Sequence, residues 1–359
     1  MIRHAQFISP ANGVEEHFFA GDAGCASDFG TDLDRLLPEL DEALRAHRCG
    51  PEDIFLLRFH LSDPANQAAL LRRKLAGRNA FISIVGQPPL NARAAAECWC
   101  IKAWRQMKNC TPCWFQTAAV KEGSYAQTAA EFAELDAFLR SRGLDMELNT
   151  VRTWLYCRDV DNNYAGLVKA RNDCFARKNL TAQTHFIAST GIEGQCEDPH
   201  RLVRMDTLNF GGLRREQIQF LYAADHLSPT ALYGVSFERG TRLRWGDRSH
   251  CIISGTASID REGQVLFTAD VRRQTRRVVE NIAALLAEAD AGIGDIKWGT
   301  LYLRDIADAA VVRDELAKGG LGPELPLVIL KAPVCRPSWL VELECLAVKA
   351  EKAPFPVFA

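Results

Sequence analysis

The sequence contains one segment twice, and this internal repeat most restricts the folds that the chain can adopt. Residues 50–77 and residues 292–319 align without a gap and share glycine, aspartate, leucine and alanine positions. Further along each copy, Glu97–Ala103 matches Glu344–Ala350, beginning with Glu-Cys in both. Self-similarity at this spacing indicates that one structural unit is used more than once.

A fainter third copy lies between these two, because residues 155–160 resemble residues 301–306. Each copy has the same order of signals: a strand or hairpin, an amphipathic helix, a strand, a second helix, and two closing strands. The expected central strands are Ile54–Leu61, Val151–Cys157 and Lys297–Leu303, and the expected second helices are Asn66–Leu75, Ala165–Phe175 and Ala307–Leu316.

This order predicts an α+β fold in which each unit is one sheet carrying two helices on one face. Three units of roughly 120 residues account for the whole length. We expect a first unit at 1–115, a second at 116–230 and a third at 231–359. The Ser/Gly-rich composition of a flexible linker does not occur between them, so we expect the units to pack tightly.

Composition indicates an ordinary globular protein, with 47% hydrophobic and 25% charged residues. The net charge of -2 provides no general attraction for nucleic acid or for an anionic membrane. No apolar run approaches the ~20 residues of a membrane span. Twelve cysteines without an apolar signal segment at the start favour a cytoplasmic protein with free thiols.

The last two strands are expected at Pro326–Lys331 and Trp339–Val348, joined by a loop with two prolines. The final strand alternates, so that Glu342 and Glu344 share one face. A carboxyl group in an apolar site has a raised pKa and can donate a proton at neutral pH. An amphipathic strand whose glutamates face water explains the pattern equally well.

Two further segments have patterns that predict local structure: a hairpin in the third unit and a strand followed by a loop in the second. A long hairpin is expected from Tyr233–Arg244 and Cys251–Ile259 at the start of the third unit. A strand is expected at His185–Ala188, followed by a loop at Ser189–Gly194, because this segment is rich in small polar residues.

The C-terminal third, residues 252–348, resembles the RidA/YjgF family. The resemblance rests on Ile253-Ser254-Gly255, on Asn281, on Thr300–Leu303 and on Val341–Glu344. Proteins of this family are homotrimers with a site at each subunit interface, so the resemblance implies a single-chain pseudo-trimer. Members that hydrolyse imines carry an arginine in the penultimate strand, where this chain has Leu327.

Most of residues 80–350 is similar to the chorismatase family, which builds a longer chain from RidA-like units. The matching stretches are Val151–Tyr156, Ile187–Ile192, Ser236–Gly240, Ile253–Ile259, and Cys335 with Glu342. The resemblance implies cleavage of the enol-pyruvyl ether of chorismate, with release of pyruvate. It implies Glu342 as the general acid and Cys335 as a pocket residue that favours 3-hydroxybenzoate as the product, in the setting of secondary metabolism.

We expect the substrate carboxylates to be held by guanidinium groups, which bind a carboxylate through two N–H donors. The candidate substrate-binding residues are Arg152, Tyr222, Tyr233, Arg239, Gly240 and Gly255. Each also has an ordinary structural explanation: a strand arginine in an ion pair, a half-buried tyrosine or a turn glycine. Cys335 is as readily a small buried hydrophobe, and no neighbouring histidine in the sequence would activate it as a nucleophile.

No metal or cofactor is expected. Cys98, Cys100, Cys110 and Cys113 are close in sequence, but their spacing is not that of a zinc knuckle. Two other functions stay open: a RidA-like hydrolase of imines or enamines, against which Leu327 counts, and a non-catalytic small-ligand-binding protein. A chain that already contains three units is expected to be a monomer, with a small molecule as its partner and neither nucleic acid nor membrane.

Overall fold

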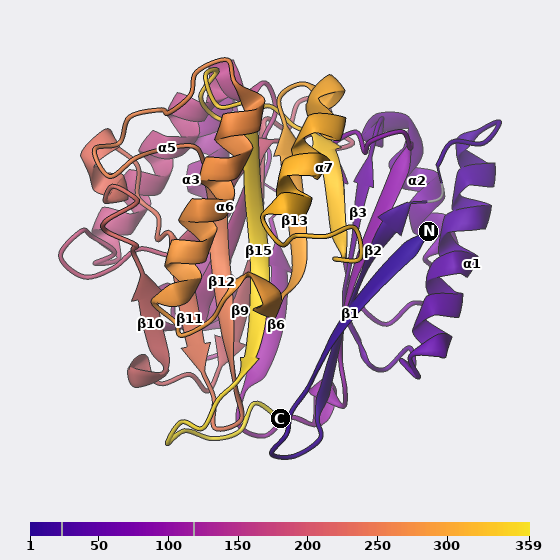
Figure 1. Ribbon diagram of the computed structural model, residues 1–359, viewed down its shortest axis with the longest axis horizontal. Helices are drawn as coiled ribbons and strands as arrows, with labels where there is room; N and C mark the ends of the chain where they lie inside the picture. Colours follow the sequence, from indigo (N-terminus) through magenta and orange to yellow (C-terminus); the bar gives the residue numbers. More distant parts are fainter. Residues whose placement is uncertain (23, 118) are drawn as a thin grey trace.

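The structure is a computed structural model that describes residues 1–22, 24–117 and 119–359. Three β-sheets surround a common interior, and the helices cover their outer faces (Figure 1). The α+β fold built from repeated sheet-and-helix units is therefore confirmed. In the described part of the chain, no helix combines the length and apolar character needed to cross a membrane.

The first sheet has the strand order β1-β2-β5-β3-β4. Helices α1 (Phe29–Ala46) and α2 (Pro64–Lys74) pack their apolar side chains against its outer face. The strands are β1 (Ile2–Ile8), β2 (Glu15–Asp22), β3 (Ile54–Leu61), β4 (Phe81–Gly86) and β5 (Ala94–Ile101).

The second sheet has the order β6-β9-β7-β8 and carries helices α3 (Gly123–Arg140) and α5 (Val160–Arg177), with the short α4 (Met146–Asn149) between them. The expected second helix of this unit, Ala165–Phe175, lies within α5. The strands are β6 (Thr111–Gln116), β7 (Thr150–Cys157), β8 (Ala188–Glu193) and β9 (Val203–Gly211).

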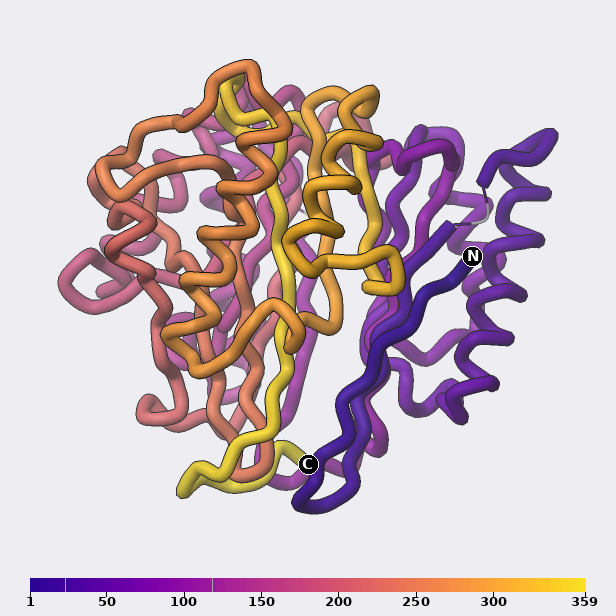
Figure 2. The backbone as a smooth tube through the Cα atoms, viewed as in Figure 1, coloured from indigo at the N-terminus to yellow at the C-terminus, as the bar shows by residue number. Residues whose placement is uncertain are grey.

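The third sheet has the order β10-β11-β12-β15-β13-β14 and carries α6 (Val271–Ala287) and α7 (Ala309–Lys318). The chain ends at the lower edge of the view, beside the β1–β2 hairpin (Figure 2), where the Phe358 ring is buried against Trp245. The strands are β10 (Ile218–Leu221), β11 (Gly240–Arg244), β12 (Arg248–Ala257), β13 (Ile296–Leu303), β14 (Leu327–Lys331) and β15 (Val341–Ala350).

The three sheets repeat one pairing pattern down to a local irregularity. In each, a central strand pairs parallel with the strand that follows it and antiparallel with the closing strand. The antiparallel register shifts near the start of each central strand, between Ile54 and Leu56, Thr150 and Arg152, and Ile296 and Trp298. A bulge placed alike in all three sheets is a structural sign of the internal repeat.

This register makes Glu97, Asp206 and Glu344 equivalent, since they stand opposite Arg58, Trp154 and Thr300. Each of the three acids is buried and bonds to the next unit around the interior. Glu97 accepts from the Thr300 hydroxyl at 2.9 Å, and Asp206 accepts from the Ser83 hydroxyl at 2.5 Å. Glu344 accepts from Arg152 at 2.7 Å, so the acids join the units in a ring.

Two interpretations of the sequence are corrected here. Ser189–Gly194 was expected as a loop, but most of it lies in β8, which pairs parallel with β7. The side chains of Ser189 and Thr190 are buried at the seam with the third unit, where Ser189 N–H donates to the Ser254 hydroxyl at 2.9 Å. The expected strand Tyr233–Arg244 begins only at Gly240, because residues 230–239 form a turn and a loop.

The three sheets also bear on where each unit begins. Strand β6 starts at Thr111 and belongs to the second sheet, and β10 starts at Ile218 and belongs to the third. By sheet membership the changes of unit therefore fall at 102–110 and 212–217, earlier than the expected 115/116 and 230/231.

We predict that the ring of acids determines much of the stability. Glu97→Ala leaves the buried Arg58 guanidinium without its partner at 2.5 Å and should lower the free energy of unfolding by about 3–5 kcal/mol. Glu42→Ala, on the exposed side of α1, is the control and should change it by less than about 0.5 kcal/mol. Urea unfolding followed by tryptophan fluorescence measures both. A loss below about 1 kcal/mol for Glu97→Ala would contradict this view of the ring.

Candidate active site

A cavity lies between the second and third units. Helix α5 and strand β8 form one wall. The loop before β11, strand β12, the loop before β15 and the start of β15 form the other. Of the eight residues expected at the site, Glu342, Cys335, Tyr233, Arg239 and Gly255 line this cavity together.

Glu342 projects from β15 into the cavity and is only 5% exposed. Burial raises its pKa to about 8, and the negative charge of Glu344 adds to the rise. The guanidinium groups of Arg152 and Arg239 oppose the shift without cancelling it. At neutral pH Glu342 is therefore a protonated carboxylic acid, and the interpretation that it faces water is wrong.

The backbone of β12 opens to make room for this carboxyl group. The pairing of β12 with β15 shifts register between Ile253 and Thr256, next to Glu342. A Cβ atom on Gly255 would stand 2.0 Å from Glu342 Oε1, so any side chain there would displace the carboxyl group. Gly255 thus has a specific function in the site: it lets the acid lie against the main chain.

Two arginines of the third unit line the cavity. Arg239 is buried, and its Nη2 donates to the Ser228 carbonyl oxygen at 3.0 Å. Arg336 lies in the loop before β15, stacked on the rings of Tyr233 at 4.7 Å and Trp339 at 4.9 Å. These contacts fix the positions of both guanidinium groups beside Glu342.

Arg171, on helix α5, supplies a third guanidinium group from the opposite wall. Its side chain is 0% exposed, and none of its three guanidinium nitrogens has a hydrogen-bond partner among the described residues. The nearest ring is that of Phe237, at 6.0 Å. A buried cation without a partner is costly, and its presence at a cavity wall indicates that an anion binds there.

Cys335 is a wall residue whose thiol stays protonated. Burial and the charge of Glu342 raise the pKa of the thiol to about 12. Interaction with the Tyr164 hydroxyl opposes this rise. A thiol with a pKa this high is a poor nucleophile at neutral pH, so the chemistry of this residue is limited to shaping the cavity and contacting what binds.

Arg152 was expected to hold substrate, but it lies outside this cavity. It donates from Nη2 to Glu344 at 2.7 Å and to the Thr190 hydroxyl, within the ring of acids. On its central strand, the side chain of Arg152 points to the interior of the molecule. The pattern of a single strand does not show which of its two faces is the interior one. Arg152 acts on Glu342 only through its charge, which lowers the pKa of that carboxyl.

Tyr222 and Gly240 also lie outside the cavity. Tyr222 is 49% exposed and lines a neighbouring groove that shares Arg239 and Phe237 with the cavity. Gly240 is packed between the side chains of Ile253 and Leu221, where a Cβ atom would stand 3.1–3.2 Å from each. Neither residue is among those that line the Glu342 cavity.

Sequence analysis missed Arg171, Arg336, Tyr164 and Trp339 at this site. Arg171 lies within the expected helix Ala165–Phe175 and Tyr164 directly precedes it, but nothing in the sequence marked either as a site residue. Arg336 directly follows Cys335, so its place beside a candidate site residue was the one usable signal.

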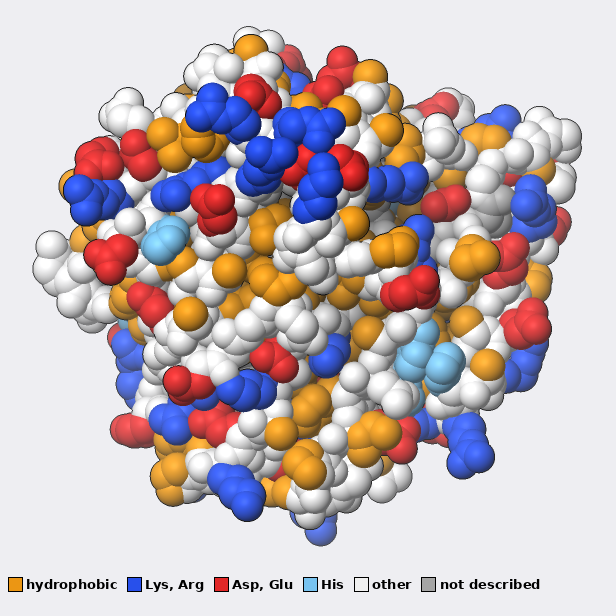
Figure 3. Space-filling model, viewed as in Figure 1, with side chains coloured by type: hydrophobic (Ala, Val, Ile, Leu, Met, Phe, Trp, Pro, Cys, Tyr) orange, Lys and Arg blue, Asp and Glu red, His pale blue; other side chains and the backbone are white. Residues whose placement is uncertain are grey.

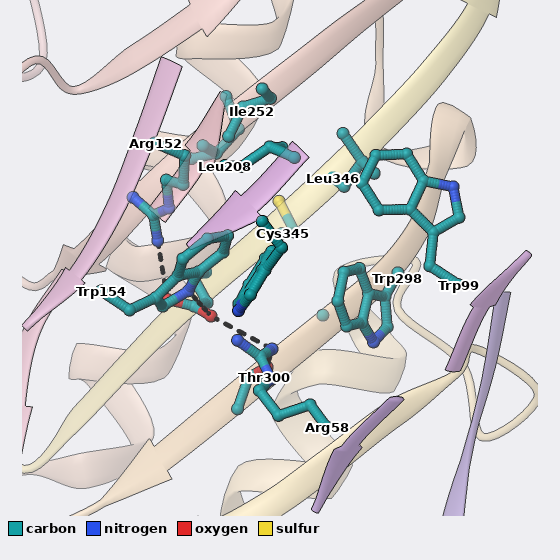
Figure 4. Close-up of a pocket in the computed structure, with 14 residues that line it drawn as sticks. Arg58, Trp99, Arg152, Trp154, Leu208, Ile252, Trp298, Thr300, Cys345 and Leu346 are labelled. Atoms are coloured by element: carbon teal, nitrogen blue, oxygen red, sulfur yellow. Dashed lines mark hydrogen bonds and ion pairs between the residues drawn. The ribbon is translucent and has the colours of Figure 1, made fainter. Parts of the chain in front are cut away.

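A second space lies in the interior between the sheets. Trp99, Trp154 and Trp298 line it from all three units (Figure 4). The carboxylate of Glu344 pairs with Arg152 at 2.7 Å and with Arg58 at 3.6 Å. The Arg58 guanidinium lies over Trp154 at 5.3 Å and over Trp298 at 5.0 Å. This space belongs to the packing of the three units.

The four cysteines that are close in sequence do not form one cluster. The sulfurs of Cys98 and Cys100 are 3.6 Å apart under the helices of the first unit. Cys110 donates to the Phe358 carbonyl oxygen in the interior, and Cys113 is on the second sheet. No group of cysteines among the described residues has the arrangement that would hold a metal ion.

Comparison with known proteins connects this geometry to one family. Residues 247–349 match the family model described as Endoribonuclease L-PSP. A RutC family protein from Pyrococcus abyssi is 34% identical over 98 residues, which cover 27% of this chain and 76% of the relative. The chain belongs to the RutC family. The segment that matches the Endoribonuclease L-PSP model runs from the start of β12 almost to the end of β15 and includes Gly255, Cys335 and Glu342.

Solved structures extend the likeness to the whole RutC-family chain. A chorismatase crystal structure at 1.08 Å resolution superposes with a TM-score of 0.68 at 18% identity, covering 97% of this chain and 99% of that one. RidA from an Antarctic Psychrobacter species covers 36% of this chain and 98% of its own, with 19% identity and a TM-score of 0.29. The chorismatase match confirms the fold of repeated RidA/YjgF-like units in one chain.

We predict that Arg171 destabilises the RutC-family chain in exchange for binding an anion. Arg171→Met removes the unpaired buried charge at similar volume and should raise the free energy of unfolding by about 1–4 kcal/mol. Arg177→Met, at the exposed end of the same helix, is the matched control and should change it by less than about 0.5 kcal/mol. Urea unfolding at low ionic strength measures both, and a destabilised Arg171→Met protein would contradict the prediction.

Proposed function

We propose that this protein is a chorismatase that cleaves the enol-pyruvyl ether of chorismate by general acid catalysis. The observation that carries the proposal is the protonated carboxyl group of Glu342, which faces a cavity lined by three guanidinium groups. A chorismatase-like fold over nearly the whole chain supports the same assignment.

The charges of the cavity suit a substrate with two carboxylates. Arg239 and Arg336 lie on the wall of the third unit and Arg171 lies on the wall of the second. Chorismate is a dianion, so one carboxylate would take the unpaired donors of Arg171 and the other would pair with the arginines opposite. Trp339 and Phe237, which also line the cavity, offer apolar surface to the ring of the substrate.

The reaction requires a proton on the methylene carbon of the enol-pyruvyl group. Glu342 would supply it, and the carboxylate that remains would stabilise the oxocarbenium ion that forms. The neighbouring ring hydroxyl then attacks the ring carbon that bears the ether oxygen and displaces that oxygen. The protonated enol-pyruvyl group leaves as pyruvate. Opening of the resulting ring oxide gives hydroxybenzoate, so chorismate divides into two acids with no net consumption of water.

We assign 3-hydroxybenzoate as the main product. Cys335 places a small apolar thiol on the cavity wall close to Glu342, where attack by a water molecule would otherwise lead to a dihydroxycyclohexadiene carboxylate. An apolar wall that keeps water away from the cation favours attack by the ring hydroxyl.

The alternative function is hydrolysis of imines or enamines, as in RidA-like proteins, and membership of the RutC family favours it. Against it, the position expected to hold the carboxylate-binding arginine is Leu327, whose carbonyl oxygen accepts from Arg3 at 3.0 Å in a groove apart from the Glu342 cavity. Release of ammonia from an amino-acid-derived imine, with chorismate left intact, would establish this alternative.

The main test is incubation with chorismate, with an enzymatic assay for pyruvate and chromatography of the aromatic acid. Glu342→Gln keeps the shape of the side chain but cannot donate an acidic proton, so kcat should fall by ~10²–10⁴-fold with little change in KM. Glu262→Gln, in an exposed turn, is the control and should keep full activity. Pyruvate release by Glu342→Gln at the rate of the unmodified protein would contradict the mechanism.

We also predict the pH dependence of kcat. The active form of Glu342 is protonated, so the rate should be level at neutral pH and should fall as the pH rises through about 8. Initial rates of pyruvate release between about pH 4 and about pH 10 measure this profile. A rate that already falls near pH 5, as for an ordinary glutamate, would show that Glu342 is ionised when the enzyme is active.

A further inference from the structure

Three histidines gather in the first unit, away from the Glu342 cavity. His4 is on β1, His17 is on β2, and His47 caps the C-terminal end of α1. One ring nitrogen of each lies within 4.8 Å of those of the other two. Histidine side chains are visible together at the surface between β1 and the lower end of α1 (Figure 3, viewed as in Figure 1).

The sheet explains why the first two histidines meet. In the β1–β2 pairing His4 stands opposite Phe19, and His17 stands opposite Gln6, so both rings project from the same face of the sheet. The Nε2 atom of His4 is 3.0 Å from the Nδ1 atom of His17. Two nitrogens that bind one tetrahedral zinc ion at ~2.0–2.1 Å are separated by roughly 3.3 Å, so this pair already has almost the required spacing.

A carboxylate prepares His17 for this function. Glu15 Oε2 lies 2.9 Å from His17 Nε2, on the far side of the ring from His4. The hydrogen bond keeps the proton on Nε2 and leaves the lone pair of Nδ1 directed at the centre of the cluster. A carboxylate that accepts from the outer nitrogen of a histidine is the usual support of a metal-binding imidazole.

His47 completes the group from the helix. Its ring stacks on His4 with centroids 3.4 Å apart, and the side chain is partly exposed. A rotation of this ring would bring a nitrogen toward the His4–His17 pair. The buried ring of Phe19, 4.7 Å from His4, forms an apolar floor below the cluster.

The surrounding charges favour a cation. Glu15 contributes a negative charge, and the nearby ammonium group of Lys102 is paired with Asp53 at 2.8 Å. With the imidazoles neutral, the local net charge is -1 by this count: two carboxylates against one ammonium group. A divalent ion with a preference for imidazole suits this set of donors better than Ca²⁺ or Mg²⁺, which prefer oxygen.

We propose that His4, His17 and His47 form a site for a divalent transition-metal ion such as Zn²⁺, with Glu15 as the supporting carboxylate. Three imidazoles leave a fourth position for water. The site would join the edge strand β1 to β2 and to the end of α1, and so hold the N-terminal strand on the first unit. This departs from the expectation that the chain binds no metal, and it does not depend on the proposed chorismatase activity.

The test is calorimetric titration of the full chain with ZnCl₂ after treatment with EDTA and its removal. We expect one Zn²⁺ per chain, with affinity lowered at least ~10-fold in His4→Gln and in His47→Gln, and by ~10–100-fold in Glu15→Gln. His200→Gln, at an exposed position in the second unit, is the matched control and should bind as the unmodified protein does. Zn²⁺ should raise Tm in the unmodified protein and in His200→Gln, but little in His47→Gln.

Titration with Co²⁺ separates this site from the cysteines. The proposal predicts visible absorption bands without the near-ultraviolet bands of cobalt–thiolate bonds. Absence of zinc binding at one ion per chain would overturn the proposal, as would equal affinity in His4→Gln and His47→Gln or a thiolate spectrum. The partly exposed His47 gives a variant that should fold, and its Tm without metal, equal to that of the unmodified protein, checks this.

Discussion

The ring of buried acids, Glu97, Asp206 and Glu344, is the constraint on which the rest of the structure depends. Each acid stands at the same place on the closing strand of its unit and bonds to a side chain of the next unit. Burying a carboxylate is favourable only when donors surround it, so the three sheets must meet at one relative position to supply those donors. The cavity between the second and third units is a consequence of that arrangement.

The same register explains why one of the three units presents a carboxyl group at the position of the proposed proton donor. The residues two positions before the acids are Ala95, Arg204 and Glu342, and all three point to the same face of their sheets as the acids do. Ala95 has no acidic group. Arg204 is a cation that already donates to the Ile84 carbonyl oxygen of the first unit and to Asp206. Only Glu342 combines an acidic side chain with the space that Gly255 leaves open.

The candidate site combines groups that each oppose folding. Glu342 loses its hydration without gaining a partner that keeps it ionised, and Arg171 is buried without a hydrogen bond. Such groups persist where the remainder of the protein is stable enough to bear their cost. Here the ring of acids and the tryptophans of the interior supply that stability. The acids and tryptophans that hold the three units together are therefore different from the residues that line the Glu342 cavity.

The sequence predicted the repeated unit well, because strand periodicity and shared positions survive in all three copies. The central strand of the first unit was predicted at Ile54–Leu61, as found. Glu342 was found because a carboxyl in an apolar strand is a local signal. Arg152 was expected at the site and Arg171 was missed, because one strand or helix shows which face a residue is on, but not which neighbouring unit covers that face. The polar strand β8 was interpreted as a loop for the same reason. Ser189 and Thr190 find hydrogen-bond partners in the third unit, which the sequence of one strand does not show.

The most direct test of the account is the protonation state of Glu342. Infrared spectra of the unmodified protein and of Glu342→Gln, recorded at a series of pH values, isolate the carbonyl band of this one carboxylic acid by difference. The account predicts that the band is present at pH 7 and disappears as the pH rises through about 8. A band that disappears near the ordinary pKa of glutamate, about 4.5, would show an ionised Glu342 at neutral pH and would contradict the central claim.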